Sequence, residues 1–376
     1  MIEREDILEI VQAYDMSNLH IGVLGSHSAL DVIDGAKDEG LATFVVCQKG
    51  RELPYKRYGR LIDKILVLES FADIMGEDVQ EKLRENNVVW VPNRSFVVYP
   101  GVEKVQNEFR VPMIGTRSIL HIEDRERYEK NYYWLCQKAG LPTPREFNSP
   151  EEIDRLVMVK IPLAKKKVER GFFTCASPQE YREKVDLLLK QGIIEKGDLR
   201  LQRIEEYVVG PVFNFNYFHS PITETTEFLG IDRRLETNLD GIVRIPSQQQ
   251  ETANLTPTYL IVGHTPATIR ESQLNMVFKM GDQFVEAAER YFPPGIIGPF
   301  CLQTIATSTF VDYSTSELEY VTYDVAVRIG GGTNIYLGVG SQYSKLYYGT
   351  PISMGRRIAL EVKDALERGR LGEIVT

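Results

Sequence analysis

The chain has 376 residues, 43% of them hydrophobic and 26% charged, which is typical of a globular protein with two or three domains. Its formal net charge of −9 argues against a general nucleic-acid-binding protein. The charged start of the chain and the lack of an apolar run of about 18 residues argue against a signal peptide and a membrane span, so we expect a cytoplasmic protein. The four cysteines form no CxxC pair, which argues against a zinc site or a disulfide framework.

The first third of the chain alternates short apolar runs with helical patterns. We expect strands at residues 20–25, 42–47, 64–68 and 88–91, and helices at 5–14, 29–39 and 78–87. Strands that alternate with helices predict a parallel sheet, and we place this α/β domain at residues 1–122.

Two loops of this domain carry polar side chains where parallel sheets bind ligands. His27 and Ser28 follow the first strand, and Ser28 is a predicted helix cap beside a ready anion site. Ser95 follows the strand at 88–91, at the edge where open α/β sheets bind ligands. The alternative is a helix cap and a polar turn without a ligand.

The middle of the chain, residues 123–212, predicts a second unit. A helix is expected at 125–138, strands at 156–161, 172–175 and 201–210, and a helix at 179–191. The segment between the first two strands contains Lys165, Lys166 and Lys167. It could close over a polyphosphate, or it could be an exposed charged turn.

Residues 213–376 predict a third unit with strands at 213–218 and 227–231 and helices at 276–292 and 353–367. Two further strands, 298–304 and one leading from Tyr323 into a glycine turn, predict an antiparallel hairpin that places Gln303 near Asp324. Arg328 continues the face of Asp324. Such a group suits Mg²⁺ and a phosphate, although Asp324 and Arg328 could equally form a surface ion pair.

The order of these features resembles the ATP-grasp superfamily: a helix break at 139–142, a strand with Lys160, the string Glu205-Glu206-Tyr207-Val208, and the hairpin. The implied fold is α/β and α+β, an ATP-grasp fold with an N-terminal parallel α/β (pre-ATP-grasp) domain. Longer strings are similar to the archaeal formate-dependent FAICAR synthetases of purine biosynthesis, among them Leu24-Gly25-Ser26-His27-Ser28, Pro293-Pro294-Gly295-Ile296-Ile297-Gly298-Pro299-Phe300 and Gly331-Gly332-Thr333-Asn334.

This resemblance implies a ligase that uses ATP and Mg²⁺ to convert formate to formyl phosphate, which the 5-amino group of AICAR attacks to give FAICAR. It also implies a homo-oligomer. The implied substrate-binding residues are His27, Ser28, Ser95 and His264. The implied ATP-binding residues are Lys160, Glu205, Glu206, Tyr207, Val208 and Glu236. Gln303 and Asp324 would be the metal ligands, and Arg328 and His27 would act in catalysis.

The chain departs from the family pattern at four places. The phosphate loop, residues 162–171, keeps only its last glycine; Asp324 is a shorter acid than the expected Glu; Ala326 offers no oxygen; and His264 replaces an expected Asn. These departures indicate a diverged paralogue. It could be an active FAICAR synthetase, a ligase for a different acid or amine, or a non-catalytic nucleotide-binding regulator of an active paralogue.

Overall fold

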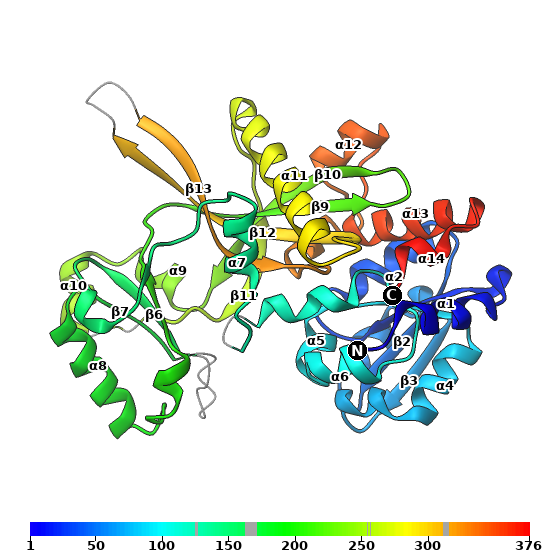
Figure 1. Cartoon of the computed structure of the whole chain (residues 1–376), viewed down its shortest axis with the longest axis horizontal. Coiled ribbons are helices and arrows are strands. Elements are labelled where there is room, and N and C mark those ends of the chain that lie inside the picture. Colours follow the sequence, from blue (N-terminus) through cyan, green and yellow to red (C-terminus); the bar gives the residue numbers. More distant parts are fainter. Residues whose placement is uncertain (125–126, 162–170, 254, 256, 311–315) are drawn as a thin grey trace.

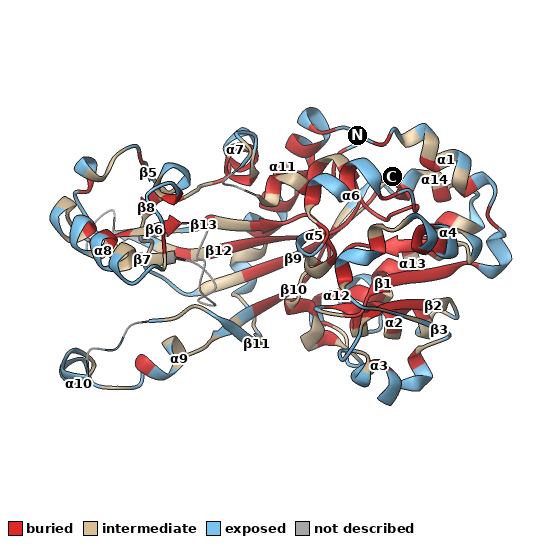
Figure 2. Cartoon of the chain, turned by 90° about the horizontal axis from the view of Figure 1, so that it is seen from below, coloured by how far each residue is buried: buried red, intermediate tan, exposed pale blue. Residues whose placement is uncertain are grey.

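The computed structural model of the chain describes residues 1–124, 127–161, 171–253, 255, 257–310 and 316–376, in which three β-sheets organise the molecule (Figure 1). One sheet is parallel and two are antiparallel. Buried residues follow the parallel sheet and the central sheet (Figure 2). Across these described residues, no helix combines the length and apolar character needed to cross a membrane.

The N-terminal sheet is parallel, which confirms the prediction from the alternating pattern. Its order is β3-β2-β1-β4, with β1 (His20–Leu24), β2 (Ala42–Gln48), β3 (Lys64–Leu68) and β4 (Val88–Val91). The helices of this part are α1 (Arg4–Gln12), α2 (Ala29–Asp38), α3 (Leu53–Arg57), α4 (Glu77–Glu85), α5 (Arg94–Val98) and α6 (Val102–Glu108). Since the strands are parallel, the loops after β1 and β4 emerge at the same edge of the sheet.

A small antiparallel sheet of order β5-β8-β6-β7 forms a separate lobe with its own apolar core. Its elements are β5 (Glu146–Phe147), β6 (Val157–Ile161), β7 (Gly171–Cys175), β8 (Arg203–Glu206) and α8 (Pro178–Lys190). The cationic segment with Lys165, Lys166 and Lys167 lies outside the described residues.

The helix predicted at 125–138 was wrong in its start, because α7 (Tyr132–Lys138) begins only at Tyr132. The Asn131 side chain accepts hydrogen bonds from the backbone amides of Tyr133 and Trp134, at 3.0 and 3.2 Å. An Asn that caps in this way satisfies amides that have no partner inside the helix, so the helix starts there.

The central sheet is antiparallel, of order β11-β10-β9-β12-β13. Its strands are β9 (Val212–Ser220), β10 (Thr225–Glu236), β11 (Ile261–Pro266), β12 (Gly298–Phe310) and β13 (Ser316–Ala326). The accompanying helices are α9 (Leu239–Ile242), α10 (Ser247–Thr252) and α11 (Leu274–Tyr291). The β12–β13 register sets Gln303 directly opposite Asp324, which confirms the predicted hairpin.

The last helices, α12 (Gln342–Tyr348), α13 (Met354–Glu367) and α14 (Leu371–Ile374), return to the N-terminal part of the molecule. The Ser353 side chain caps α13 as predicted, accepting from the Arg356 amide at 3.2 Å. Helix α13 packs closely on α2, and the two chain ends lie near each other (Figure 1). The three sheets span residues 20–91, 146–206 and 212–326, while the domain limits at 122 and 212 stay a prediction.

Candidate functional site

The loops after β1 and β4 are tied together by Asn93. Its side-chain oxygen caps α5 by accepting from the Phe96 amide at 3.0 Å, and its amide nitrogen donates to the carbonyls of Leu24 and Ser26, both at 3.0 Å. The Ser95 hydroxyl lies 2.9 Å from that of Ser26. Ser95 and the loop of His27 are therefore neighbours, at the sheet edge where the sequence predicts them.

His27 has a left-handed backbone, with φ of 58°, at the end of this loop. Ser28 occupies the cap position of α2, as predicted, although its side chain makes no capping hydrogen bond. Its buried hydroxyl instead lies 3.1 Å from His27 Nδ1.

The imidazole of His27 is exposed but lies among cations. Desolvation by the surrounding atoms and then the positive charges of Arg328 and Arg94 lower the pKa of His27 to about 3. Desolvation and the nearby positive charges both disfavour an imidazolium, so both lower the pKa of His27. His27 is therefore neutral at physiological pH and serves as a hydrogen-bonding group.

The turn after β13 brings this loop to the central sheet through two glycines. A Cβ on Gly331 would lie 2.9 Å from His27 Nε2, and a Cβ on Gly332 would lie 2.2 Å from an Asp232 oxygen. Gly332 therefore needs glycine for the close approach, because Asp232 is buried, whereas a Cβ on Gly331 would require the exposed His27 ring to shift. Asn334 extends the contact, donating to the His27 carbonyl at 2.9 Å.

Asp232 on β10 is a buried acceptor that the sequence prediction missed. It accepts from Asn214 at 2.7 Å, Asn216 at 2.8 Å and His264 Nδ1 at 2.7 Å. The polar positions 214 and 216 alternate with aromatic residues along β9, which was the available signal that one face of this strand is polar.

Glu123 holds two arginines beside His27. It accepts from Arg94 Nη1 at 3.2 Å, from Arg328 Nη2 at 3.0 Å and from the Val327 amide at 3.0 Å. Arg328 is buried, so the interpretation of Asp324 and Arg328 as a surface ion pair was wrong. Glu123 was missed because no local pattern links it to residues 200 positions away.

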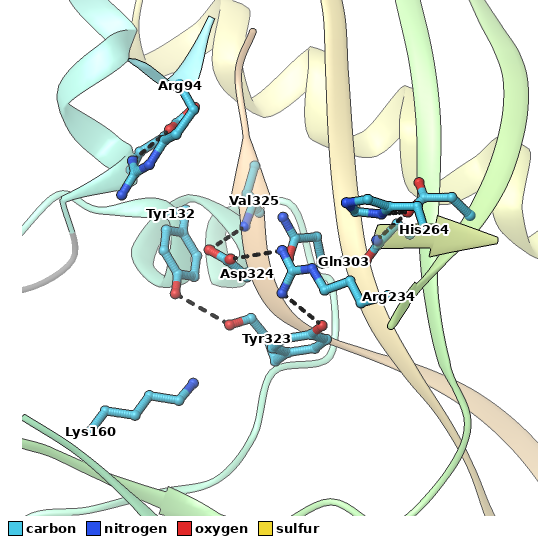
Figure 3. A network of polar contacts seen from close by, with 12 residues as sticks. Arg94, Tyr132, Lys160, Arg234, His264, Gln303, Tyr323, Asp324 and Val325 are labelled. Carbon is cyan, nitrogen blue, oxygen red and sulfur yellow. Dashed lines mark hydrogen bonds and ion pairs between the residues drawn. The ribbon is translucent and has the colours of Figure 1, made fainter. Parts of the chain in front are cut away.

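Arg234 occupies the predicted metal site (Figure 3). Its guanidinium donates to Gln303 Oε1 and lies 3.7 Å from Asp324 Oδ2 and 3.5 Å from the Tyr323 hydroxyl. Burial alone would lower the pKa of Arg234, but Tyr323 and Asp324 outweigh it and raise that pKa. Ala326, opposite Cys301 in the hairpin, is buried and supplies no further oxygen.

The donor set of this site is compatible with Mg²⁺. Gln303 offers an amide oxygen and Asp324 a carboxylate, and Mg²⁺ is usually held by one or two carboxylates together with phosphate oxygens and water. Arg234 would have to share or leave these oxygens. In the described part of the chain, no group of three or more His, Cys, Asp and Glu side chains could hold a metal.

Lys160 lies on β6 across from the hairpin, on the far side of Tyr132 and Tyr323 in Figure 3. Its ammonium contacts Glu205 and donates to the Tyr133 hydroxyl at 2.9 Å, while that hydroxyl donates to Glu205 at 2.6 Å. Burial would raise the pKa of Glu205, but the charge of Lys160 and these hydrogen bonds lower it. Two predicted ATP-binding residues are thus in contact.

The remaining predicted ATP-binding residues lie at the ends of β8 and β10. Tyr207 is hydrogen-bonded to Tyr259, which also lies near Glu236; burial and then Tyr207 and Glu236 raise the pKa of Tyr259 to about 12. Burial also raises the pKa of Glu236. The backbone amides of Glu206 and Tyr207 donate within the protein, at 2.8 and 3.0 Å. Val208 follows directly in the chain.

The chain matches two family models and several named proteins. A family described as a protein of unknown function (DUF1246) matches residues 21–147, and a domain of unknown function (DUF1297) matches residues 180–376. The chain is 46% identical, over 376 residues and the whole of both chains, to a Methanopyrus kandleri protein named 5-formaminoimidazole-4-carboxamide-1-(beta)-D-ribofuranosyl 5'-monophosphate synthetase.

Two solved structures have the same fold. The IMP biosynthesis protein PurP from Thermococcus kodakaraensis is 29% identical with a TM-score of 0.71, over 95% of this chain and 100% of that one. A Hydrogenobacter thermophilus biotin carboxylase domain, in complex with MgADP and bicarbonate, is 15% identical with a TM-score of 0.53, over 90% and 69%. These similarities confirm the ATP-grasp fold that the sequence resemblance implies.

Proposed function

Because this chain belongs to the family of 5-formaminoimidazole-4-carboxamide-1-(beta)-D-ribofuranosyl 5'-monophosphate synthetases, we propose that it formylates AICAR with formate and ATP. The observation that carries the proposal is the convergence of Arg94, Arg234 and Arg328 around the neutral His27, beside Gln303 and Asp324. Such a cationic site suits a reaction whose substrates and intermediate are all anions.

The reaction needs an activated acid, since formate itself has no leaving group. Transfer of the γ-phosphoryl group of ATP to a formate oxygen gives formyl phosphate, which the amine of AICAR attacks with release of phosphate. Arg328 and Arg234 would bind the negative charge of the phosphoryl group, because guanidinium groups remain protonated even when buried. Mg²⁺, bound through Gln303 and Asp324, would neutralise the phosphate charge.

The substrates would enter from two sides. His27, Ser28 and Ser95 of the parallel-sheet domain and His264 of β11 would bind the nucleotide substrate. Lys160, Glu205, Glu206, Tyr207, Val208 and Glu236 would hold ATP between the small lobe and the central sheet. In this arrangement Lys160 exchanges its contact with Glu205 for a phosphate oxygen.

A formate-dependent assay tests the proposal. Purified protein with ATP, Mg²⁺, formate and AICAR is expected to release ADP and form FAICAR in equal amounts, with both products absent when formate or AICAR is omitted. Arg328→Gln should abolish FAICAR formation. ADP release that ignores formate, or the absence of FAICAR under all conditions, would contradict the proposed reaction.

A second candidate function is a nucleotide-binding regulator without turnover. It is favoured by Ala326, which has no side-chain oxygen to bind a metal, and by the contacts of Arg234 with both predicted metal ligands. It predicts that AICAR binds in calorimetry while ATP and Mg²⁺ do not. A ligase for another acid predicts ADP release with acids other than formate. Sedimentation velocity of the purified protein tests the predicted homo-oligomer. The same measurement on a mixture with an active paralogue tests whether the two proteins associate.

A further inference from the structure

We infer that Asp232 is a positioning residue that makes His264 Nε2 a hydrogen-bond acceptor for an N–H group of the nucleotide substrate. The inference rests on the proposed function and adds that the substrate group next to His264 is a hydrogen-bond donor. It concerns a residue pair on β10 and β11, strands that are neighbours in the central sheet.

The contacts of Asp232 determine which nitrogen of His264 carries the hydrogen. Asp232 is 1% exposed, and both Asn214 and Asn216 donate to its oxygens. A carboxylate surrounded by donors acts as an acceptor only, so its third contact, at 2.7 Å, requires a hydrogen on His264 Nδ1. A neutral imidazole has one N–H, so Nε2 keeps its lone pair.

The position of His264 puts that lone pair at the candidate site. The His264 side chain is 18% exposed, whereas the Asp232 side chain that its Nδ1 contacts is 1% exposed. Because Nδ1 faces Asp232, Nε2 lies on the edge of the ring that points away from this buried carboxylate. His264 pairs with Arg234 in the β10–β11 register and lies close enough to His27 for a charge on either ring to affect the other. The turn through Gly331 and Gly332 contacts both His27 and Asp232, which joins the two sides.

The chemistry of an acceptor at this place selects the substrate. AICAR carries N–H donors on its 5-amino group and its 4-carboxamide, and its 4-carboxylate analogue presents an acceptor in place of the carboxamide. With the 4-carboxamide N–H as the group that meets Nε2, the analogue would set two acceptors facing each other, which leaves a buried group unpaired, so the analogue should bind more weakly. The Asn expected at position 264 from the family resemblance offers an amide oxygen, which can serve as the same acceptor.

Nitrogen NMR of histidine-labelled protein without ligand tests the tautomer directly, with His264→Asn assigning the signals. The expected result is an unprotonated Nε2 in the wild type, and loss of this fixed tautomer in Asp232→Ala. A protonated Nε2 in the wild type at neutral pH would overturn the inference. This readout does not depend on turnover, so it is separate from the failure of the proposed reaction.

Calorimetric binding of AICAR and its 4-carboxylate analogue tests the role. The wild type should prefer AICAR by about tenfold or more, His264→Asn should retain the preference, and His264→Leu should lose most of it. Asp232→Ala should lower the affinity for AICAR by about tenfold when residue 264 is the natural His. The same substitution in a His264→Asn protein should lower the affinity clearly less, because Asn has no tautomer that Asp232 must set. Equal costs in both backgrounds, or an unchanged preference in His264→Leu, would refute the positioning role.

Discussion

At the scale of single residues, Glu123 is a buried carboxylate on which two arginines depend. Its side chain is 4% exposed and pairs with Arg328, which is itself 7% exposed, while Arg94 is 37% exposed. A buried charge that loses its partner costs far more than a solvated one. The contribution of Glu123 should therefore act mainly through Arg328.

We predict that Glu123→Gln destabilises the protein by about 3 kcal/mol, because an amide nitrogen would face arginine donors and leave Arg328 without a counter-charge. Urea unfolding measures this. The control Arg94→Gln should cost at most about 1 kcal/mol, since Arg94 can be solvated. Equal free energies of unfolding for wild type and Glu123→Gln would contradict the buried pairing.

Asp31 links α2 to the later part of the chain and titrates in an accessible range. It accepts from the Gly355 amide and from Thr333, both at 3.2 Å, and burial raises its pKa from 3.8 to about 6. Because the pKa of Asp31 is higher in the folded than in the unfolded protein, its contribution to the free energy of unfolding is fully present below about pH 4 and is lost as the pH rises through about 6. The ionised Asp31 carboxylate therefore destabilises the folded protein at neutral pH.

We predict that Asp31→Asn becomes more stable relative to the wild type as pH rises. The difference in free energy of unfolding should grow by about 3 kcal/mol between pH 4 and pH 7, from a shift of about 2 pKa units. Urea unfolding at several pH values measures it. A difference that stays flat over this range would show that Asp31 titrates normally.

At the scale of elements, the turn after β13 is the piece that couples the parallel sheet to the central sheet. Gly332 has an Asp232 oxygen 2.2 Å from its hypothetical Cβ, whereas the nearest such atom for Gly330 is Asn216 Oδ1 at 3.7 Å. The first distance is a collision and the second an ordinary contact. Gly332 and Gly330 therefore allow a controlled comparison, in which an added Cβ collides at the first position and not at the second.

We predict that Gly332→Ala displaces Asp232, costs about 1 to 3 kcal/mol of stability and lowers AICAR affinity by about tenfold or more. Gly330→Ala should leave stability and affinity almost unchanged. Thermal unfolding and calorimetry measure both variants. Similar behaviour of the two would mean that the turn does not position the site.

At the scale of the whole molecule, α2 and α13 join the two ends of the chain. A Cβ on Gly35 would lie 2.1 Å from the Arg356 backbone nitrogen, and a Cβ on Gly355 would lie 1.9 Å from the Asp31 carbonyl oxygen. The C-terminal Thr376 accepts from the Arg117 amide at 2.9 Å, which anchors the chain end in the N-terminal part. Helix α13 also contacts the central sheet, because Arg357 pairs with Glu227 of β10 at 2.9 Å, so this helix joins the parallel sheet to the central sheet.

We predict that Gly35→Ala destabilises the protein by about 1 to 3 kcal/mol, although alanine in a helix interior normally gains up to about 1 kcal/mol over glycine. Gly241→Ala is the control, since its Cβ in α9 would meet nothing within 4 Å and should be stabilising. Chemical denaturation measures both. A stabilising Gly35→Ala would contradict close packing of α2 on α13.

The sequence by itself determined the parallel N-terminal sheet and the Gln303–Asp324 pairing. These follow from local periodicity and turn chemistry, which neighbouring residues encode. It also placed His27 and Ser95 in loops that follow parallel strands, and Lys160 on a strand, as the structure has them. The start of α7 was not predicted correctly, because the Asn131 cap begins the helix inside a stretch whose sequence pattern is helical throughout.

Only the tertiary structure decided which side chains act together. Asp232 gathers Asn214, Asn216 and His264, and Glu123 gathers Arg94 and Arg328, across separations that no periodicity spans. Each of these carboxylates is buried, so it must be surrounded by donors wherever packing brings them. The partners are therefore set by the packing of the sheets and cannot be read from any stretch of sequence alone.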